Sequence, residues 1–215
     1  QQRINFAKKG GSNCDILLMS ATPIPRTMMM SIYGDMDISR LREKPMNRKK
    51  IITLSKPENK IDDLWPFIKK KIKEKEQIFW VCPLIEDSNK LDFSSTARLF
   101  ELLNKKFNNN VGIIHGSLDK IEKDKVLKEF LDKKISILVS TTVIEVGIDF
   151  PNATVIVIEN ANKFGLAQLH QLRGRIGRGT KEGTCILMFK NQLSQNARKR
   201  IQILKSSDDG FYIAE

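Results

Sequence analysis

The fold is decided around Leu166-Ala167-Gln168-Leu169-His170-Gln171-Leu172-Arg173-Gly174-Arg175-Ile176-Gly177-Arg178, a stretch that lies between two apolar runs. The runs cover residues 154–159 and 184–189, and short runs of this kind are typical of buried strands. The stretch between them predicts a helix over residues 166–173. A strand, a helix and a second strand in this order predict two parallel strands joined by a helix.

The same alternation of strands and helices runs along most of the chain. Further strands are predicted at residues 15–20, 78–82, 111–114 and 135–140, and further helices at residues 95–107, 120–131 and 194–204. Another helix is expected from apolar residues at helical spacing, with Pro66 in its first turns: Ile61, Leu64, Trp65, Ile68 and Ile72. The helix at 120–131 is expected to bury Ile121, Val126, Leu127, Phe130 and Leu131.

The alternation defines the fold class. We predict an α/β fold, a parallel β-sheet with helices on both faces. Ligands of such sheets bind beyond the carboxyl ends of the strands, so the functional motifs are expected to gather at that edge.

A linker is predicted at residues 45–50, where Pro45 and Asn47 stand among clustered charges. It separates a leading piece, residues 1–44, from a main domain at residues 51–205. Residues 206–215 are expected to begin a further element.

The composition predicts a water-soluble protein of the cytoplasm. Cys14, Cys82 and Cys185 show no Cys-x-x-Cys spacing and lie in apolar runs, so we expect buried free thiols rather than disulfides or a metal site. Neither an apolar run approaching the ~18 residues of a membrane span nor a signal-like start occurs, and no membrane partner is expected.

The charge favours a polyanionic partner. Lys and Arg number 37 against 25 Asp and Glu, a formal net charge of +12. Part of this excess has a plainer interpretation, because runs such as residues 69–71 and 73–75 look like solvated helix faces in a chain rich in Lys, Ile and Asn. The argument for a nucleic acid therefore depends on motifs.

Five motifs together resemble those of the superfamily 2 helicases: residues 20–27 (Ser-Ala-Thr-Pro-Ile-Pro-Arg-Thr), 77–88, 114–117 (Ile-His-Gly-Ser), 141–149 (Thr-Thr-Val-Ile-Glu-Val-Gly-Ile-Asp) and 164–178. Residues 33–37, 82–86 and 168–175 are most similar to the bacterial branch that remodels branched DNA, such as stalled replication forks, in recombination and repair. The resemblance implies the RecA-like second motor lobe of an ATP-dependent DNA helicase, a P-loop NTPase-type fold.

Two motifs of a complete helicase do not occur in the sequence, the phosphate loop and the acidic Mg²⁺-binding box. In proteins of this branch the acidic box is followed by Gln-Gln-Arg, and this chain opens with Gln1-Gln2-Arg3. We therefore interpret it as a piece with the tail of the first lobe and all of the second. ATP and Mg²⁺ would be held mainly by the first lobe, and the piece alone is predicted to be inactive.

Arg175 and Arg178 are the catalytic candidates. Guanidinium groups present a fixed, permanently charged fork to phosphoryl oxygens, and we expect both on one face of a helix. A basic, solvated helix end is the alternative interpretation. The resemblance makes both residues arginine fingers, which reach the γ-phosphate held by the first lobe.

The resemblance also implies other roles. Gly147, Asp149 and Gln171 would approach the nucleotide, although a plain turn glycine and an exposed helical Gln are alternatives. The residues that would couple hydrolysis in one lobe to movement of the other are Ser20, Ala21 and Thr22.

Two segments are candidate DNA contacts. Thr141 and Thr142 lie between a strand and a predicted helix start, where hydroxyl and N–H groups can hold a phosphate. His115 and Gly116 follow a strand in the same way. Plain helix caps and a turn histidine would look the same.

Three functions remain open. The first is the fork-remodelling helicase, whose first lobe and wedge domain would be partners within the full-length chain. The second is the transcription-repair coupling translocase, which shares residues 22–27, although residues 82–86 argue against it. The third is a stand-alone nucleic-acid-binding or regulatory module.

Overall fold

The structure, a computed structural model, describes residues 19, 39, 41, 49–83, 89–108, 110–141, 150, 152–190, 192–210 and 213. Its strands are β1 (Ile51–Pro57), β2 (Gln77–Cys82), β3 (Val111–Ile114), β4 (Ile137–Thr141), β5 (Ala153–Ile158) and β6 (Gly183–Phe189). Its helices are α3 (Trp65–Lys73), α4 (Asn89–Lys106), α5 (Lys120–Leu131), α6 (Leu166–Arg173) and α7 (Gln195–Ser206), with short 3₁₀ helices η1 (Glu58–Leu64) and η2 (Ala161–Lys163). The strand expected at 15–20 lies outside the described residues, apart from residue 19, and the domain boundaries stay predictions.

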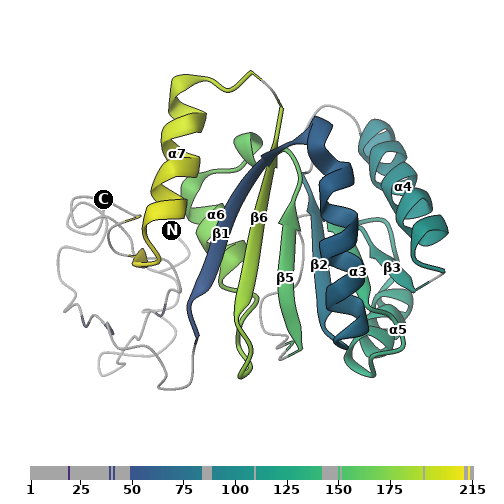
Figure 1. The fold of residues 1–215 in the computed structure, drawn as a ribbon. Helices are drawn as coiled ribbons and strands as arrows, with labels where there is room; N and C mark the ends of the chain where they lie inside the picture. The colour runs from purple at the N-terminus through teal and green to yellow at the C-terminus, as the bar shows by residue number, and fades with distance from the viewer. Residues whose placement is uncertain are drawn as a thin grey trace, which may run out of the picture.

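The described strands form one six-stranded sheet in the order β1-β6-β5-β2-β4-β3. Each neighbouring pair of strands is parallel. Figure 1 shows the strands side by side, with helices packed against the sheet. The predicted α/β class is therefore confirmed.

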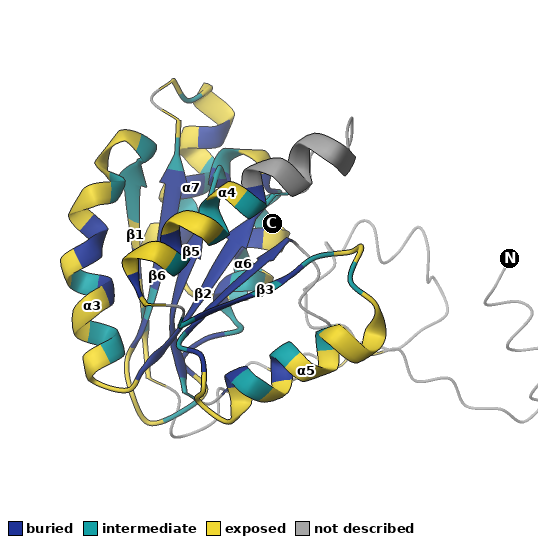
Figure 2. Cartoon of the chain, turned by 90° about the vertical axis from the view of Figure 1, so that its right-hand side faces the viewer, coloured by how far each residue is buried: buried dark blue, intermediate teal, exposed yellow. Residues whose placement is uncertain are grey.

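Helices cover both faces of the sheet, and each face has its own apolar core. One core joins Trp65 and Ile68 of α3 and Leu103 of α4 to the strands. The other joins α5, α6 and α7 to the opposite face, with Leu169 and Leu204 among its buried residues. Figure 2 shows the resulting pattern of buried strands and helices that are exposed on their outer sides. Two-sided burial explains why most strands are continuous apolar runs.

Strand β1 is the one described strand that the sequence analysis did not predict. It is the outermost strand on one side of the sheet and pairs only with β6 among the described strands, from Ile51↔Gly183 to Pro57↔Phe189. Its residues alternate in exposure, and Ile52 and Leu54 remain 48% and 43% exposed. An edge strand needs no continuous apolar run, and Pro57 at its end removes no ladder donor from the interior.

Several helix predictions need correction. In α5, Ile121 is 81% exposed and Leu131 is 45% exposed, although both were expected to be buried. The buried stripe of this helix is centred on Leu127 and Phe130, and a 100° step per residue turns Ile121 to the opposite side. The α-helix expected from Ile61 begins instead at Trp65, after the 3₁₀ turn η1, and α4 begins at Asn89, six residues earlier than predicted.

Parallel strands give the sheet two distinct edges. The carboxyl edge holds the ends of the strands, including Cys82 paired with Thr141. The amino edge holds the beginnings, including Ile51 paired with Gly183 and Gln77 paired with Ala153. In Figure 1 the carboxyl edge is at the top, where β6 leads into α7.

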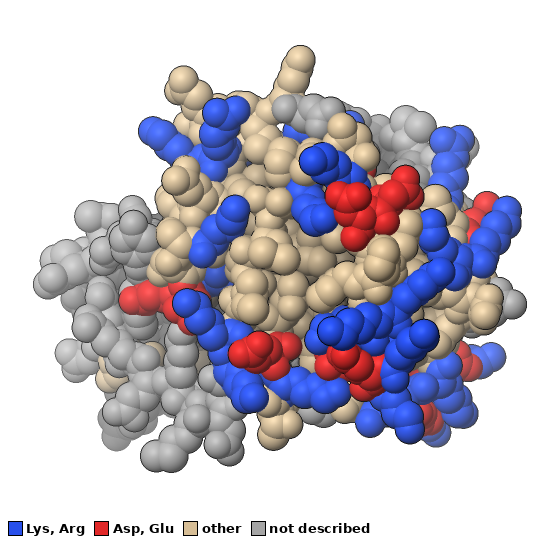
Figure 3. Space-filling view, in the orientation of Figure 1, with Lys and Arg blue, Asp and Glu red and all other residues tan. Residues whose placement is uncertain are grey.

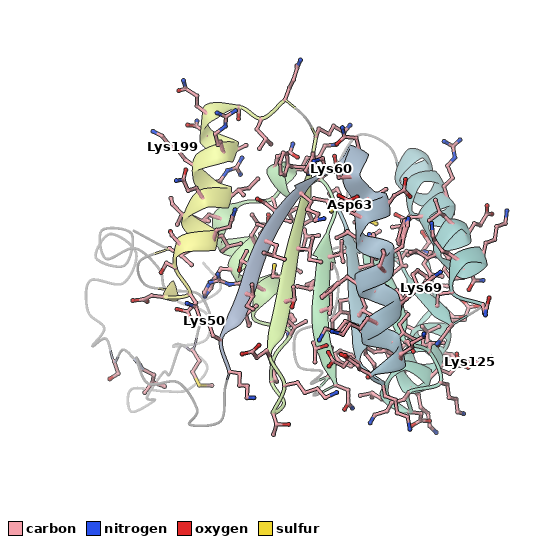
Figure 4. The ribbon with its side chains drawn as sticks, viewed as in Figure 1. Lys50, Lys60, Asp63, Lys69, Lys125 and Lys199 are labelled. Carbon is pink, nitrogen blue, oxygen red and sulfur yellow. The ribbon has the colours of Figure 1, made fainter. Side chains whose placement is uncertain are left out.

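The basic side chains are spread over the helices. In Figure 3 Lys and Arg gather toward the lower right of the face, interspersed with Asp and Glu. Lys69 on α3, Lys125 on α5 and Lys199 on α7 are exposed and extend outward from their helices in Figure 4. Their exposure agrees with the interpretation that part of the excess positive charge lies on solvated helix faces.

Candidate functional site

Helix α6 carries the chain from the carboxyl edge to the amino edge of the sheet. It follows the end of β5, and Gln168 closes its first turn by accepting the N–H of Gly165 at 2.9 Å. Leu169 and Arg173, one turn apart, are both buried against the sheet. The helix ends at Arg173, as predicted from the sequence.

The segment after α6, residues 174–182, is called the arginine turn here. Its Gly177 N–H donates to the carbonyl oxygen of Ala153, the first residue of β5, at 3.2 Å. Gly177 has a φ of 68°, and a Cβ there would lie 3.2 Å from Cγ1 of Ile51. The Ile176 side chain is completely buried in the core. The turn is therefore fixed to the amino edge, and the expectation that the motifs gather at the carboxyl edge is wrong for this motif.

Arg175 and Arg178 lie in this turn and not on one face of a helix, which corrects the sequence prediction. Gly174 and the left-handed Gly177 follow Arg173, and glycines end a helix readily. Arg175 is half-buried, whereas Arg178 is exposed and its Nε donates to the Gly174 carbonyl oxygen at 3.3 Å.

The two guanidinium groups interact electrostatically. Burial and, to a smaller degree, the positive charge of Arg178 both lower the pKa of Arg175 from its ordinary value. An anion bound at the turn would relieve this repulsion between like charges. The donor set therefore fits a phosphate group.

The remaining nucleotide and coupling candidates are only partly described. Gln171 is exposed on α6, one turn before Arg175. Gly147, Asp149, Ser20, Ala21 and Thr22 lie outside the described residues. Their roles stay predictions.

Arg173 is a structurally important residue that the sequence analysis quoted but gave no role. It is 3% exposed, and its Nη1 donates to the carbonyl oxygens of Leu204 at 2.7 Å and Ser207 at 2.9 Å. Its Nη2 donates to Nδ1 of His170 at 2.9 Å. Arg173 thus satisfies carbonyl groups at the end of α7. Its spacing of four residues from the buried Leu169 places both on one face of α6, and this spacing could have indicated from the sequence that Arg173 is buried.

Glu76 and Lys181 were also missed. Glu76, in front of β2, is 5% exposed, and its Oε1 accepts from Lys181 Nζ of the arginine turn at 3.2 Å. No sequence signal distinguishes Glu76, because it ends a run of alternating Lys and Glu that reads as a solvated helix end.

The carboxyl edge holds the DNA candidates that the structure describes. Thr141 ends β4 and is 4% exposed, and His115 follows β3 in a half-buried position. Burial and the positive charge of Lys123 lower the pKa of His115, against the opposing effect of Glu122. The lowered pKa favours the neutral form of His115.

Gly116 leaves open space next to His115. A Cβ at Gly116 would meet nothing within 4 Å, and its φ is not left-handed. Its carbonyl oxygen accepts from Lys123 Nζ at 3.3 Å. Neither backbone strain nor packing requires a glycine at this position. Thr142 lies outside the described residues.

The two described cysteines lie in the core. Cys82 and Cys185 are buried and free, as expected, and Cys14 lies outside the described residues. Burial raises the pKa of Cys185 to about 12 and the pKa of Cys82 far above its usual value, so both thiols stay protonated. Within the described ranges no group of three or more His, Cys, Asp or Glu is placed to hold a metal ion, and no helix is long and apolar enough to cross a membrane.

This combination of a RecA-like parallel sheet and an arginine turn agrees with the family to which the sequence is similar. Residues 59–180 match the model of the helicase conserved C-terminal domain, so the chain belongs to that family. Among individual proteins the chain is similar to RecG. It is 43% identical over 217 residues to the ATP-dependent DNA helicase RecG of Bacillus subtilis, which covers 100% of this chain and 32% of that protein.

Two further comparisons agree. The RecG of Thermotoga maritima is 45% identical over 207 residues, which covers 95% of this chain and 26% of that protein. A solved structure of RecG bound to a three-way DNA junction superposes with a TM-score of 0.80 at 43% identity, covering 95% of this chain and 27% of the other. The chain therefore spans about a third of the length of the relatives that it matches, or less.

Proposed function

We propose that this chain is the second motor lobe of an ATP-dependent DNA helicase that remodels branched DNA, such as stalled forks in recombination and repair. The observation that carries the proposal is the arginine turn, which bears Arg175 and Arg178 and is fixed to the amino edge through the Gly177 N–H and the buried Ile176. The name of the relatives, ATP-dependent DNA helicase, supports ATP as the source of the phosphate. The RecG structure with a three-way junction supports branched DNA as the partner.

The arginine turn acts on a nucleotide bound by the first lobe. When the lobes close, Arg175 and Arg178 donate hydrogen bonds to the γ-phosphate and neutralise the charge that develops as it is transferred. Mg²⁺ would be held mainly by the first lobe, where it would further neutralise the phosphates. Gln171, Gly147 and Asp149 complete the contacts on this side. Ser20, Ala21 and Thr22 couple hydrolysis to lobe movement.

The carboxyl edge binds the DNA backbone. The open space at Gly116 admits a phosphate close to the main chain, and neutral His115 acts as a hydrogen-bonding group rather than a cation. Thr141 and Thr142 contribute hydroxyl or N–H groups at the end of β4. Contacts of this kind bind DNA without reading its sequence.

Steady-state ATP hydrolysis by the full-length protein tests the proposal. We expect turnover that rises when a three-way junction is added, and junction unwinding that depends on ATP. The 215-residue chain alone should hydrolyse no ATP above background, because its sequence contains no phosphate loop. A full-length protein that binds DNA but shows no DNA-stimulated hydrolysis would instead support a stand-alone binding module.

A further inference from the structure

A buried carboxylate connects the arginine turn to the middle of the sheet. Glu76 precedes β2, and its Oε2 accepts from Lys71 Nζ of α3 at 3.1 Å and from the Thr154 hydroxyl of β5. Its Oε1 accepts from Lys181 Nζ at 3.2 Å. Lys181 Nζ also donates to the carbonyl oxygen of Glu74 at 3.3 Å.

Lys181 anchors the part of the arginine turn after Arg178, whereas the contacts of Ile176 and Gly177 anchor the part before it. Ile176 and Gly177 hold the turn before Arg178, through the core and through Ala153. After Arg178, Gly179 is half-buried and residues 180–182 are exposed before the chain re-enters the sheet at Gly183. In the described part of the turn beyond Arg178, the Lys181 side chain bonds to another part of the fold, through the Glu74 carbonyl oxygen and Glu76 Oε1. The two arginines therefore lie within a loop with anchors on both sides.

The contacts of Glu76 favour its ionised form. Burial raises the pKa of Glu76, but hydrogen bonds from Thr154, Lys71 and Lys181 more than offset this, so its pKa lies below the ordinary value. The side chain of Glu76 is 6% exposed and that of Lys71 is 20% exposed, whereas Lys181 is 54% exposed. Loss of Lys181 would leave Glu76 with two partners, so the fold should tolerate its substitution better than loss of Glu76.

We propose that Glu76 and Lys181 are positioning residues for Arg175 and Arg178, with the buried carboxylate holding the far side of the arginine turn in place. The proposal rests on the proposed function of the turn in ATP hydrolysis. Neither residue touches the nucleotide. Both act by keeping the guanidinium groups at one place relative to the amino edge, where a shift of about 1 Å can cost up to ~10²-fold in rate.

The test is steady-state ATP hydrolysis by full-length Lys181→Met at saturating junction DNA. We expect kcat to fall roughly 10-fold while KM for ATP changes little, because the variant misplaces groups that act in the transition state. Lys181→Arg keeps a cation within reach of Glu76 and should recover most of the turnover. Lys69→Met, on the outer side of α3, is the matched control for loss of a surface charge and should behave as wild type.

Hydrogen exchange and a parallel Arg175→Ala protein complete the test. Faster exchange of residues 174–182 in Lys181→Met, with an unchanged thermal midpoint, supports the proposal. Equal kcat for Lys181→Met and wild type overturns it, provided that Arg175→Ala has lost turnover. If Arg175→Ala itself keeps normal turnover, the proposed function of the turn fails and the positioning role fails with it.

Discussion

The two edges of the sheet are built in different ways. At the amino edge the arginine turn is fixed by a buried Ile176, a left-handed Gly177 and the ion pair from Lys181 to Glu76. At the carboxyl edge Gly116 has empty space around it and an ordinary backbone conformation. The difference agrees with the proposal that the amino edge positions charges for ATP hydrolysis and that the carboxyl edge receives the DNA backbone.

The largest expected effect is on turnover. Arg175→Ala or Arg178→Ala in the full-length protein should lower kcat for ATP hydrolysis by roughly 10³-fold, because arginine fingers stabilise the transferring phosphate. KM for ATP should change much less. Arg198→Ala, an exposed arginine on α7, is the control. Near-normal turnover in either variant would indicate that the substituted arginine is an ordinary solvated surface residue and not an arginine finger.

The glycines of the two edges should respond differently to the same substitution. Gly177→Ala forces a Cβ into a left-handed conformation, which costs roughly 1–2 kcal/mol, and brings it within 3.2 Å of Ile51. For a chain of this size we expect a fall of roughly 2–8 °C in the thermal unfolding midpoint. Gly116→Ala should leave the midpoint unchanged. Equal shifts for both variants would contradict the comparison.

The DNA affinity should depend on the carboxyl edge. Binding of the full-length protein to duplex DNA should weaken as salt rises, without sequence preference. If a phosphate approaches Gly116, Gly116→Ala should weaken binding at every salt concentration and leave the slope of log K against log salt unchanged, because the substitution removes no charge. Arg175→Ala, at the other edge, should leave the slope unaltered. A slope that changes only in the arginine variant would place the DNA at the amino edge.

The smallest effect concerns acid stability. Because the folded pKa of Glu76 is lowered from about 4.5, its ionised form stabilises the fold above that pH, and the contribution is lost as the pH falls through the lowered value. Glu76→Gln should therefore be less stable than wild type at pH 7, and the gap should narrow below about pH 4.5. Urea unfolding of both proteins at pH 7 and below 4.5 measures this. A gap that is independent of pH would mean that the carboxylate charge contributes nothing.

The sequence predicted the sheet well because most of its strands are buried on both faces. Continuous apolar runs such as residues 111–114 can only be such strands or short buried helices, and the intervening helices decided between them. Strand β1 was not predicted, because an outermost strand with partly exposed residues such as Ile52 and Leu54 needs no continuous apolar run. Likewise, Ile121 was misassigned because apolar character was counted without its angular position on α5.

The site was less predictable, since its geometry depends on contacts that are distant in sequence. The motif around Arg175 was recognisable, but its place at the amino edge follows from the length and direction of α6. Glu76 and Lys181 are 105 residues apart, and both belong to stretches of ordinary surface charge. The residues next to Glu76 in sequence do not indicate that it is buried, because its burial depends on the pairing of β2 with β5.

Hydrogen exchange of the full-length protein tests the assignment of one ligand to each edge most directly. Junction DNA alone should protect residues 111–117 at the carboxyl edge and leave residues 174–182 unchanged. Addition of ADP with aluminium fluoride, a mimic of the transferring phosphate, should then protect residues 174–182. Protection of residues 174–182 by DNA alone, or no response there to the phosphate mimic, would contradict the account.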